Sequence, residues 1–437
     1  MQLFNPLRRV SILLLAFGAL VPFCPAQEAL RDAVQVDRAL EKRQRGLQIP
    51  AGAPDGLRWG PLQFAVGLSY ALEFDDNVNA SEVDPDSDIG NRFGINLSTL
   101  WPITERSRLG FGVGLSYLKY VQDSDQDRFD LSPDTALAYD LQAKDFLFTF
   151  YDRASYSQDV GSEPAVSGTT EYPQFENTAG LRISWVPNEW VYSVGYSHNN
   201  FISSDEEFSE QSRSAEQLFG RVAYRFAPRT QAGIEATGAL TDYTETNRES
   251  TTFSLGPFID WQATEAIRLT ARGGYVYYSF ETTAIYTNVP VFPTTVVTNN
   301  RSDTVSSYYV GLTAEHQLTR HITHGVSAVR QIRAGVNEGG DYVQDNTVSY
   351  NLGWAFHRNI RASTSVSYIW GIESLFTLEG EADEEEFRQF DFGAALSWSI
   401  TQKLTSDLGY TLTVRESNLP LRGYRRNLVS LGLRYRF

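Results

Sequence analysis

Sulfur is almost absent from this sequence. Its 437 residues include one cysteine, Cys24, and one methionine, Met1, both in an amino-terminal segment that we expect to be removed. A mature chain without cysteine has no disulfide, no thiolate metal site and no cysteine nucleophile. A long apolar run is also missing, since hydrophobic residues make up 42% and the mean hydropathy is −0.31. This composition argues against membrane-spanning helices.

Positive charge is scarce, and aromatic residues are abundant. The formal net charge is −16, which excludes the basic footprint of a nucleic-acid-binding protein. Aromatic residues reach 13%, mostly 23 tyrosines and 26 phenylalanines. Aromatic excess with modest hydropathy fits a β-barrel with aromatic girdles.

Residues 1–26 have the pattern of a signal peptide. Arg8 and Arg9 precede a short apolar stretch at 10–21, and Ala26 offers a cleavage site. The apolar stretch is too short to cross a bilayer as a stable helix. A lipid anchor on Cys24 is the weaker alternative, because Phe23 stands where lipidation requires a small residue.

Residues 27–60 are expected to form a periplasmic helix, at 28–45, and a linker rich in Pro and Gly. The helix has only a thin apolar stripe. It is either a solvated tether or a segment that enters the pore or binds a partner. It is too short to be the folded plug of an energised transporter.

The last strand of the chain has two chemically different faces. Val429, Leu431, Leu433, Tyr435 and Phe437 alternate with a set that is mostly small or charged: Leu428, Ser430, Gly432, Arg434 and Arg436. Strict alternation is typical of a β-strand between two solvents. A strand that pairs with the first strand and closes a ring leaves no open edge. The aromatic end, Tyr435 and Phe437, resembles the insertion signal of bacterial outer-membrane barrels.

The same alternation continues from Phe64 onward and repeats about every forty residues, roughly one membrane hairpin. Short connections at 104–107, 142–145, 186–189, 227–229, 263–266, 319–321, 357–359 and 401–403 alternate with long polar ones. Short periplasmic turns and long outer loops predict an all-β fold: a single transmembrane antiparallel meander β-barrel over 61–437, with about 18 strands (16–20). A soluble sandwich or propeller does not explain the rhythm, the export signal and the terminal Phe together.

Tryptophans gather near the short turns, as expected at a lipid–headgroup boundary: Trp101, Trp185, Trp190, Trp261, Trp354 and Trp398.

The start of the predicted barrel resembles a known family. Arg58-Trp-Gly-Pro61, an alternating strand and Phe74-Asp-Asp-Asn77 are similar to the opening of the putative beta-barrel porin 2 family. The resemblance covers the barrel, and it implies an outer-membrane location and a porin-like role. Some relatives resemble barrels associated with exopolysaccharide export.

Charged residues on the inner strand positions form the candidate functional site. A charge facing lipid at mid-depth costs about 2–4 kcal/mol, which favours the inward assignment. The predicted pore-lining residues are Arg182, Arg221, Arg225, Glu235, Asp260, Arg268, Arg272 and Glu315. The arginines could form a basic wall that selects anionic or hydroxyl-rich solutes. We favour the alternative that they pair with nearby carboxylates and rigidify the wall.

The long loops are acidic at 84–88, 123–127, 205–207 and 383–386, and we interpret them as a solvated, self-repelling surface. A calcium loop is less favoured, because the required Gly and closing Glu are missing. The five histidines do not form a catalytic constellation, and we expect no enzyme activity, cofactor or metal.

Two functions remain open. The first is a porin-like channel for passive diffusion of small hydrophilic solutes, with residues 281–302 as a constriction that folds inward. The second is a non-conducting barrel of an envelope assembly such as exopolysaccharide export, with the helix at 28–45 as its handle. Either barrel resides in the cell outer membrane. Its expected partners are outer-membrane lipid and lipopolysaccharide, and the barrel-assembly machinery.

Overall fold

The computed structural model describes residues 57–166, 168–205, 208–246, 248–287, 296–337, 340–376 and 382–437. The predicted signal peptide (1–26) and the predicted helix at 28–45 lie outside the described residues. No helix in the described ranges has the length and apolar character needed to cross a membrane.

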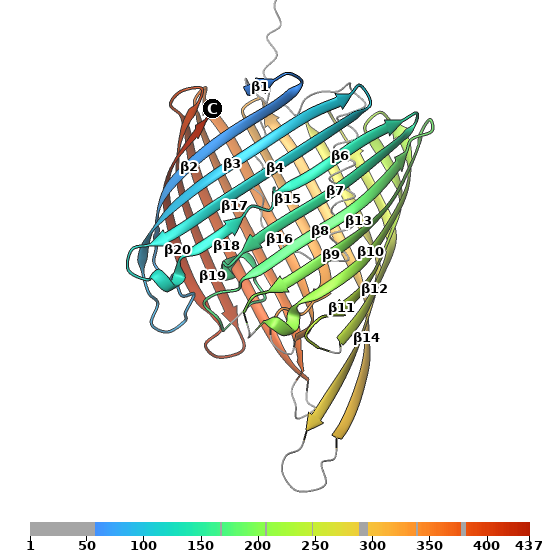
Figure 1. The fold of residues 1–437 in the computed structure, drawn as a ribbon, viewed down its shortest axis with the longest axis vertical. Helices are drawn as coiled ribbons and strands as arrows, with labels where there is room; N and C mark the ends of the chain where they lie inside the picture. Colours follow the sequence, from blue (N-terminus) through green and yellow to red (C-terminus); the bar gives the residue numbers. More distant parts are fainter. Residues whose placement is uncertain are drawn as a thin grey trace, which may run out of the picture.

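Nearly all regular structure in the described part is β-strand, in one antiparallel sheet (Figure 1). The strands are β1 (Leu57–Trp59), β2 (Leu62–Asp75), β3 (Asp88–Thr104), β4 (Ser107–Tyr120), β5 (Arg128–Leu131), β6 (Ala136–Ala143), β7 (Phe146–Ser157), β8 (Gln174–Trp185), β9 (Trp190–Ser203), β10 (Arg213–Ala227), β11 (Thr230–Tyr243), β12 (Arg248–Gln262), β13 (Ile267–Thr287), β14 (Val296–Thr319), β15 (Ile322–Ala334), β16 (Gly340–His357), β17 (Ile360–Phe376), β18 (Ala382–Ser399), β19 (Leu404–Ser417) and β20 (Tyr424–Arg436).

The sheet closes on itself where β20 pairs with β2. Leu68 lies opposite Tyr435 and Leu72 opposite Leu431, in antiparallel register. The Phe437 amide donates to the Val66 carbonyl at 3.0 Å. The last strand therefore has no open edge, which confirms the predicted ring.

Eighteen strands cross the barrel wall, as predicted. β5 and β6 both pair with β4 and β7, and together they make one strand interrupted around Pro133. Proline has no N–H for the ladder, which explains the interruption. β1 pairs only with β2, through a tight turn at Gly60, whose positive φ of 58° suits glycine.

The two faces of the wall differ as the alternation predicts. Leu431 is 53% exposed on the outer face, and apolar and aromatic side chains surround the barrel there. The six tryptophans near the short turns all point outward: Trp101, Trp185, Trp190, Trp261, Trp354 and Trp398. The inner face is polar and charged along much of its length. An apolar outer band and a polar lumen are the pattern of a barrel held in lipid.

Short turns and long loops lie at opposite ends, as predicted. The short turns gather at the upper end of the view in Figure 1, with the carboxy terminus, and the long loops gather at the lower end. Lys144 and Asn188 have φ of 54° in two of the short turns. The acidic stretches at 84–88, 123–127 and 383–386 belong to the end with the long loops, and residues 206 and 207 lie outside the described residues.

The described ends of the segment 281–302 do not fold inward, in contrast to the predicted constriction, and residues 288–295 lie outside the described residues. β13 and β14 remain paired as far as Thr287 and Val296, and they extend past the neighbouring strands as a two-stranded ribbon (Figure 1). The ribbon points away from the barrel. Thr and Val, which favour extended backbone, are frequent in these strand ends. Pro290 and Pro293 made the segment resemble one long loop.

Candidate functional site

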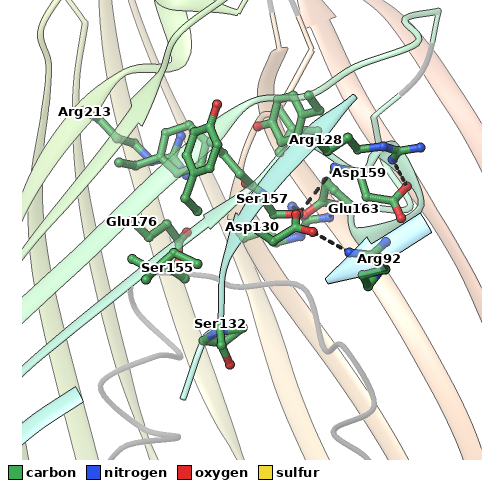
Figure 2. Close-up of a pocket in the computed structure, with 18 residues that line it drawn as sticks. Arg92, Arg128, Asp130, Ser132, Ser155, Ser157, Asp159, Glu163, Glu176 and Arg213 are labelled. Atoms are coloured by element: carbon green, nitrogen blue, oxygen red, sulfur yellow. Dashed lines mark hydrogen bonds and ion pairs between the residues drawn. The ribbon is translucent and has the colours of Figure 1, made fainter. Parts of the chain in front are cut away.

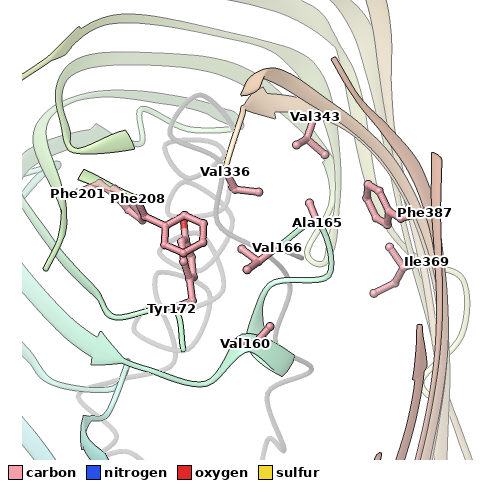
Figure 3. Packing of buried hydrophobic residues seen from close by; sticks show 10 residues of the cluster. All are labelled: Val160, Ala165, Val166, Tyr172, Phe201, Phe208, Val336, Val343, Ile369 and Phe387. Carbon is pink, nitrogen blue, oxygen red and sulfur yellow. The ribbon is translucent and has the colours of Figure 1, made fainter. Parts of the chain in front are cut away.

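A different loop enters the lumen. Residues 158–173, which we call the inner loop, connect β7 to β8. Its Val160, Ala165, Val166 and Tyr172 are buried, and Ala165 and Val166 are fully inaccessible to solvent. They pack in one apolar cluster with side chains from β9, the following loop and the opposite wall: Phe201, Phe208, Val336, Val343, Ile369 and Phe387 (Figure 3). The inner loop thus crosses the lumen and contacts the strands on the far side.

Asp159 fixes the start of the inner loop to two parts of the wall. Its Oδ1 lies 3.2 Å from Arg128 Nη1 on β5 and 2.8 Å from Arg426 Nη1 on β20. Arg426 Nε also donates to Asp75 Oδ2 on β2, at 2.8 Å. The carboxylate therefore bridges two guanidinium groups near the seam where the barrel closes.

Glu163 and Pro164 fix the middle of the inner loop to β15 and β19. Arg333 Nη1 donates to Glu163 Oε2 at 3.0 Å, and Arg333 Nε donates to Asp345 Oδ2 at 3.1 Å. Arg415 Nε donates to the Pro164 carbonyl at 2.9 Å. Charge-assisted bonds of this kind are about twice as strong as neutral ones. Together they hold the inner loop in one position across the lumen.

The two loop carboxylates have shifted pKa values in opposite directions. Burial raises the pKa of Asp159, but Arg426 and Arg128 lower it by more, so the pKa lies well below the usual aspartate value. For Glu163 burial has the larger effect and raises the pKa above the usual glutamate value, although Arg333 opposes the shift. Desolvation and paired charge act against each other at both sites.

The loop between β15 and β16 supports the inner loop. Asn337 Nδ2 donates to the Ala165 carbonyl at 2.8 Å. Glu373 accepts the amides of Val336 and Asn337, at 2.7 and 3.0 Å. Gln211, from the loop between β9 and β10, donates to the Asn337 carbonyl at 2.6 Å. Three loops therefore form one hydrogen-bonded layer at the outer end of the lumen.

A cavity of about 250 Å³ lies between the inner loop and the β5–β8 side of the wall (Figure 2). Three of its four arginines pair with acids that also line it: Arg92 with Asp130 at 2.7 Å, Arg128 with Asp159, and Arg333 with Glu163. The fourth, Arg213, lies 4.1 Å from the ring centre of Phe201. Most of the charged groups that line the cavity are therefore fixed in pairs.

The structure brings several of the predicted pore-lining residues together as ion pairs. Arg221 Nη2 lies 3.0 Å from Asp260 Oδ2, and Arg272 Nη1 lies 3.9 Å from Glu235 Oε1. Gln231 also donates to Asp260, at 3.2 Å. These contacts have the form expected if the arginines pair with nearby carboxylates in the wall.

The other predicted residues are not joined into one site. Arg182 is buried, with its guanidinium 5.4 Å from the ring centre of Phe219. Arg225 is half-buried on the inner set of β10 positions. Arg268 and Glu315 lie opposite each other in the register of β13 and β14, near the short turns. None of these four belongs to the cluster around the inner loop.

The predicted insertion residues Tyr435 and Phe437 lie at the end of β20, both partly exposed on the outer face. Their ring centres are 4.9 Å apart, with the rings edge to face. This geometry leaves both rings accessible at the periplasmic rim.

Sequence reasoning missed the anchors of the inner loop: Asp159, Glu163, Arg333, Arg415 and Arg426. One local signal was available. Val160, Pro164, Ala165 and Val166 are apolar residues inside a connection that is otherwise polar. Such a group in a loop indicates that the loop is packed against something. Within the described ranges, no three His, Cys, Asp or Glu residues are grouped so that they could hold a metal ion.

The sequence profile of the family described as "Putative beta-barrel porin 2" matches residues 50–437. The chain belongs to this family. It is an outer-membrane β-barrel of the porin type, as the closed barrel and the family together establish.

Solved structures are similar to this chain only at very low identity. OpdQ of Pseudomonas aeruginosa is 10% identical, with a TM-score of 0.47 over 87% of this chain and 99% of that chain. OccAB3 of Acinetobacter baumannii is 9% identical, with a TM-score of 0.44 over 87% of this chain and 100% of that chain. No curated protein sequence matches this member of the family. Its assignment therefore rests on the family profile.

Proposed function

We propose that this porin-family barrel is a channel for passive diffusion of small hydrophilic solutes, and that the inner loop is its constriction. The observation that carries the proposal is the attachment of the inner loop to the opposite wall through Arg333 and Arg415. A barrel of about this strand number is wide enough for an aqueous pore. A loop fixed across such a lumen narrows it.

The charged wall supports weak charge selectivity. The Arg221–Asp260 and Arg272–Glu235 pairs leave little net charge on that part of the wall. A pore lined by paired charges offers hydrogen bonds to solutes of either sign, whereas strong selectivity needs a ring of one sign. Small size and polarity, more than charge, then determine which solutes pass.

The remaining expectations belong to the same proposal. Residues 1–26 direct export, and the barrel-assembly machinery reads Tyr435 and Phe437. Outer-membrane lipid and lipopolysaccharide surround the barrel, which has no catalytic role. The other function, a non-conducting barrel of an envelope assembly, predicts no solute flux.

Liposome swelling with sugars of increasing size tests the proposal. The first variant replaces residues 160–166 by seven Gly and Ser residues, which removes the buried apolar contacts and the Glu163 anchor. The matched control deletes residues 288–299, which are the connection between β13 and β14 and the first four residues of β14. We expect faster swelling and a higher size limit for the loop variant, and an unchanged rate for the control. Absence of swelling for wild type and loop variant alike would contradict the channel and favour the scaffold barrel.

A further inference from the structure

A row of polar and aromatic side chains crosses the outer face of five strands, β15–β19. Arg330 lies opposite Asn346, Asn346 opposite Trp370, Trp370 opposite Arg388, and Arg388 opposite Glu416 in strand register. We call these five residues the rim row. Arg330 shares its face with exposed Val326, and Trp370 is itself an exposed outer side chain. The rim row therefore faces away from the lumen.

The rim row lies at the height of the outer-leaflet headgroups. Arg330 is eight residues from Ile322, where β15 begins at the periplasmic turn, and Trp370 is ten residues from Ile360 on β17. A tilted strand needs about 9–11 residues to cross the bilayer. Charge at this depth is far less costly than at the membrane centre, and it meets the polar part of the lipid.

Arg330 is held in place before any ligand arrives. Its guanidinium lies 4.4 Å from the ring centre of Tyr308, and Nη1 donates to Asn346 Oδ1 at 3.1 Å. Asn346 Nδ2 in turn donates to the Trp370 carbonyl at 3.4 Å. An oriented guanidinium is suited to a phosphate or carboxylate.

Arg388 is exposed and is not paired with an acid of the described chain. Glu416 lies opposite it in register, but no ion pair within 4 Å joins the two side chains. The arginines that anchor the inner loop, in contrast, lie against carboxylates. A cation at a lipid boundary requires water or an anionic headgroup as its partner.

Arg330 lies where two strands separate. β14 and β15 stop pairing at Val310 and Arg330 in the described residues, and β14 continues outward paired with β13.

The opposite side of the barrel differs in charge at a similar height. Glu216 on β10 is outward and exposed, and it accepts hydrogen bonds from Tyr196 and His198. An anion would be repelled there, as it would beside Glu416 at the β19 end of the rim row. The outer surface is therefore asymmetric, with free cationic groups on the β15–β18 side.

We propose that Arg330 and Arg388, with Tyr308 and Trp370 beside them, bind the phosphate groups of an anionic glycolipid of the outer leaflet. Three strand spacings of about 4.8 Å separate the two arginines, so each guanidinium group meets its own phosphate group. The rings lie at the boundary between sugar and acyl chains, where aromatic side chains settle. The inference is independent of solute flux, because the rim row does not face the lumen.

Binding of purified lipid A to the full-length protein in detergent, followed by native mass spectrometry, tests this inference. Bisphosphorylated and dephosphorylated lipid A are compared on wild type, on the double variant Arg330→Gln/Arg388→Gln, and on Arg388→Gln alone. The matched control is Arg320→Gln/Arg358→Gln, which removes two arginines from the short turns at the other end of the same strands.

We expect wild type to prefer the phosphorylated lipid. We also expect affinity to fall about five-fold for Arg388→Gln and about thirty-fold for the double variant, since each basic residue near an anionic membrane surface contributes about this much. The control should bind as wild type does. Equal binding of both lipids by wild type would overturn the inference, a result that needs no variant to fold. Unchanged affinity in Arg388→Gln would also overturn it.

Discussion

Arg333 of β15 and Glu163 of the inner loop, 170 residues apart in sequence, meet in the barrel lumen, where Arg333 Nη1 donates to Glu163 Oε2 at 3.0 Å. The side chains are 2% and 8% exposed. Asp345 takes the Nε donor of the same guanidinium. The position of the inner loop depends on this pair, because no other described contact joins the centre of the loop to β15 by paired charges.

Removing one member of the pair should release the inner loop. In Arg333→Met, Glu163 and Asp345 lose their shared cation, and an unpaired buried charge costs about 3–5 kcal/mol. We expect single-channel current noise and mean conductance to rise. Arg358→Met, in an exposed short turn, is the control and should conduct as wild type does. If current noise and mean conductance were unchanged in Arg333→Met, the Arg333–Glu163 pair would not hold the constriction in place.

Acid should release the two loop anchors in sequence. Because the pKa of Glu163 is raised, its carboxyl takes up a proton at a higher pH than an exposed glutamate, and the pair with Arg333 is then lost. This protonation favours the folded over the unfolded chain as pH falls, since the charged form is the one that burial disfavours.

Asp159 behaves in the opposite way. Its pKa is lowered, so its stabilising contribution is present above the usual aspartate range and is lost only when the pH falls through the lowered pKa. We therefore expect conductance to rise on mild acidification. Glu163→Gln should remove this rise, and Asp159→Asn should retain it. The same pH profile in wild type and Glu163→Gln would contradict the assignment.

The Arg221–Asp260 pair should stabilise the wall without setting ion selectivity. Asp260→Ala leaves Arg221 buried without its carboxylate and should lower the free energy of unfolding by about 3–5 kcal/mol. Arg221→Met/Asp260→Leu should recover most of the loss, as measured by urea unfolding in lipid vesicles. Because removal of the whole pair leaves the net charge of the wall unchanged, the reversal potential of Arg221→Met/Asp260→Leu should equal that of wild type. A shift toward cation selectivity would support the basic wall instead.

The carboxy-terminal residue should affect assembly more than stability. Phe437 closes the ring through its amide, and its side chain packs only against Tyr435 at the rim among the ring contacts described. Deletion of Phe437 should reduce the heat-modifiable, folded fraction in cells several-fold, whereas Phe437→Trp should preserve it. If the deletion and Phe437→Trp gave the same folded fraction, the terminal aromatic ring would not be a recognition signal for the barrel-assembly machinery.

Local patterns were sufficient for the barrel and insufficient for its constriction. In a β-strand, side chains two residues apart lie on the same face. The sequence therefore reveals directly which residues of β20, and which tryptophans, point outward. The inner loop depends on contacts such as Arg426 with Asp159, which are 267 residues apart. No local periodicity reports such a pairing. The segment 281–302 was misinterpreted for a related reason, because Pro290 and Pro293 within it hide the extension of β13 to Thr287 and the start of β14 at Val296.

Single-channel conductance of wild type and of the Gly/Ser replacement of residues 160–166, in the same planar bilayer, tests the central claim most directly. The account predicts discrete wild-type openings and a clearly larger unitary conductance for the variant, because the segment that crosses the lumen has been released. Equal unitary conductance of the two proteins would contradict the inner loop as the constriction.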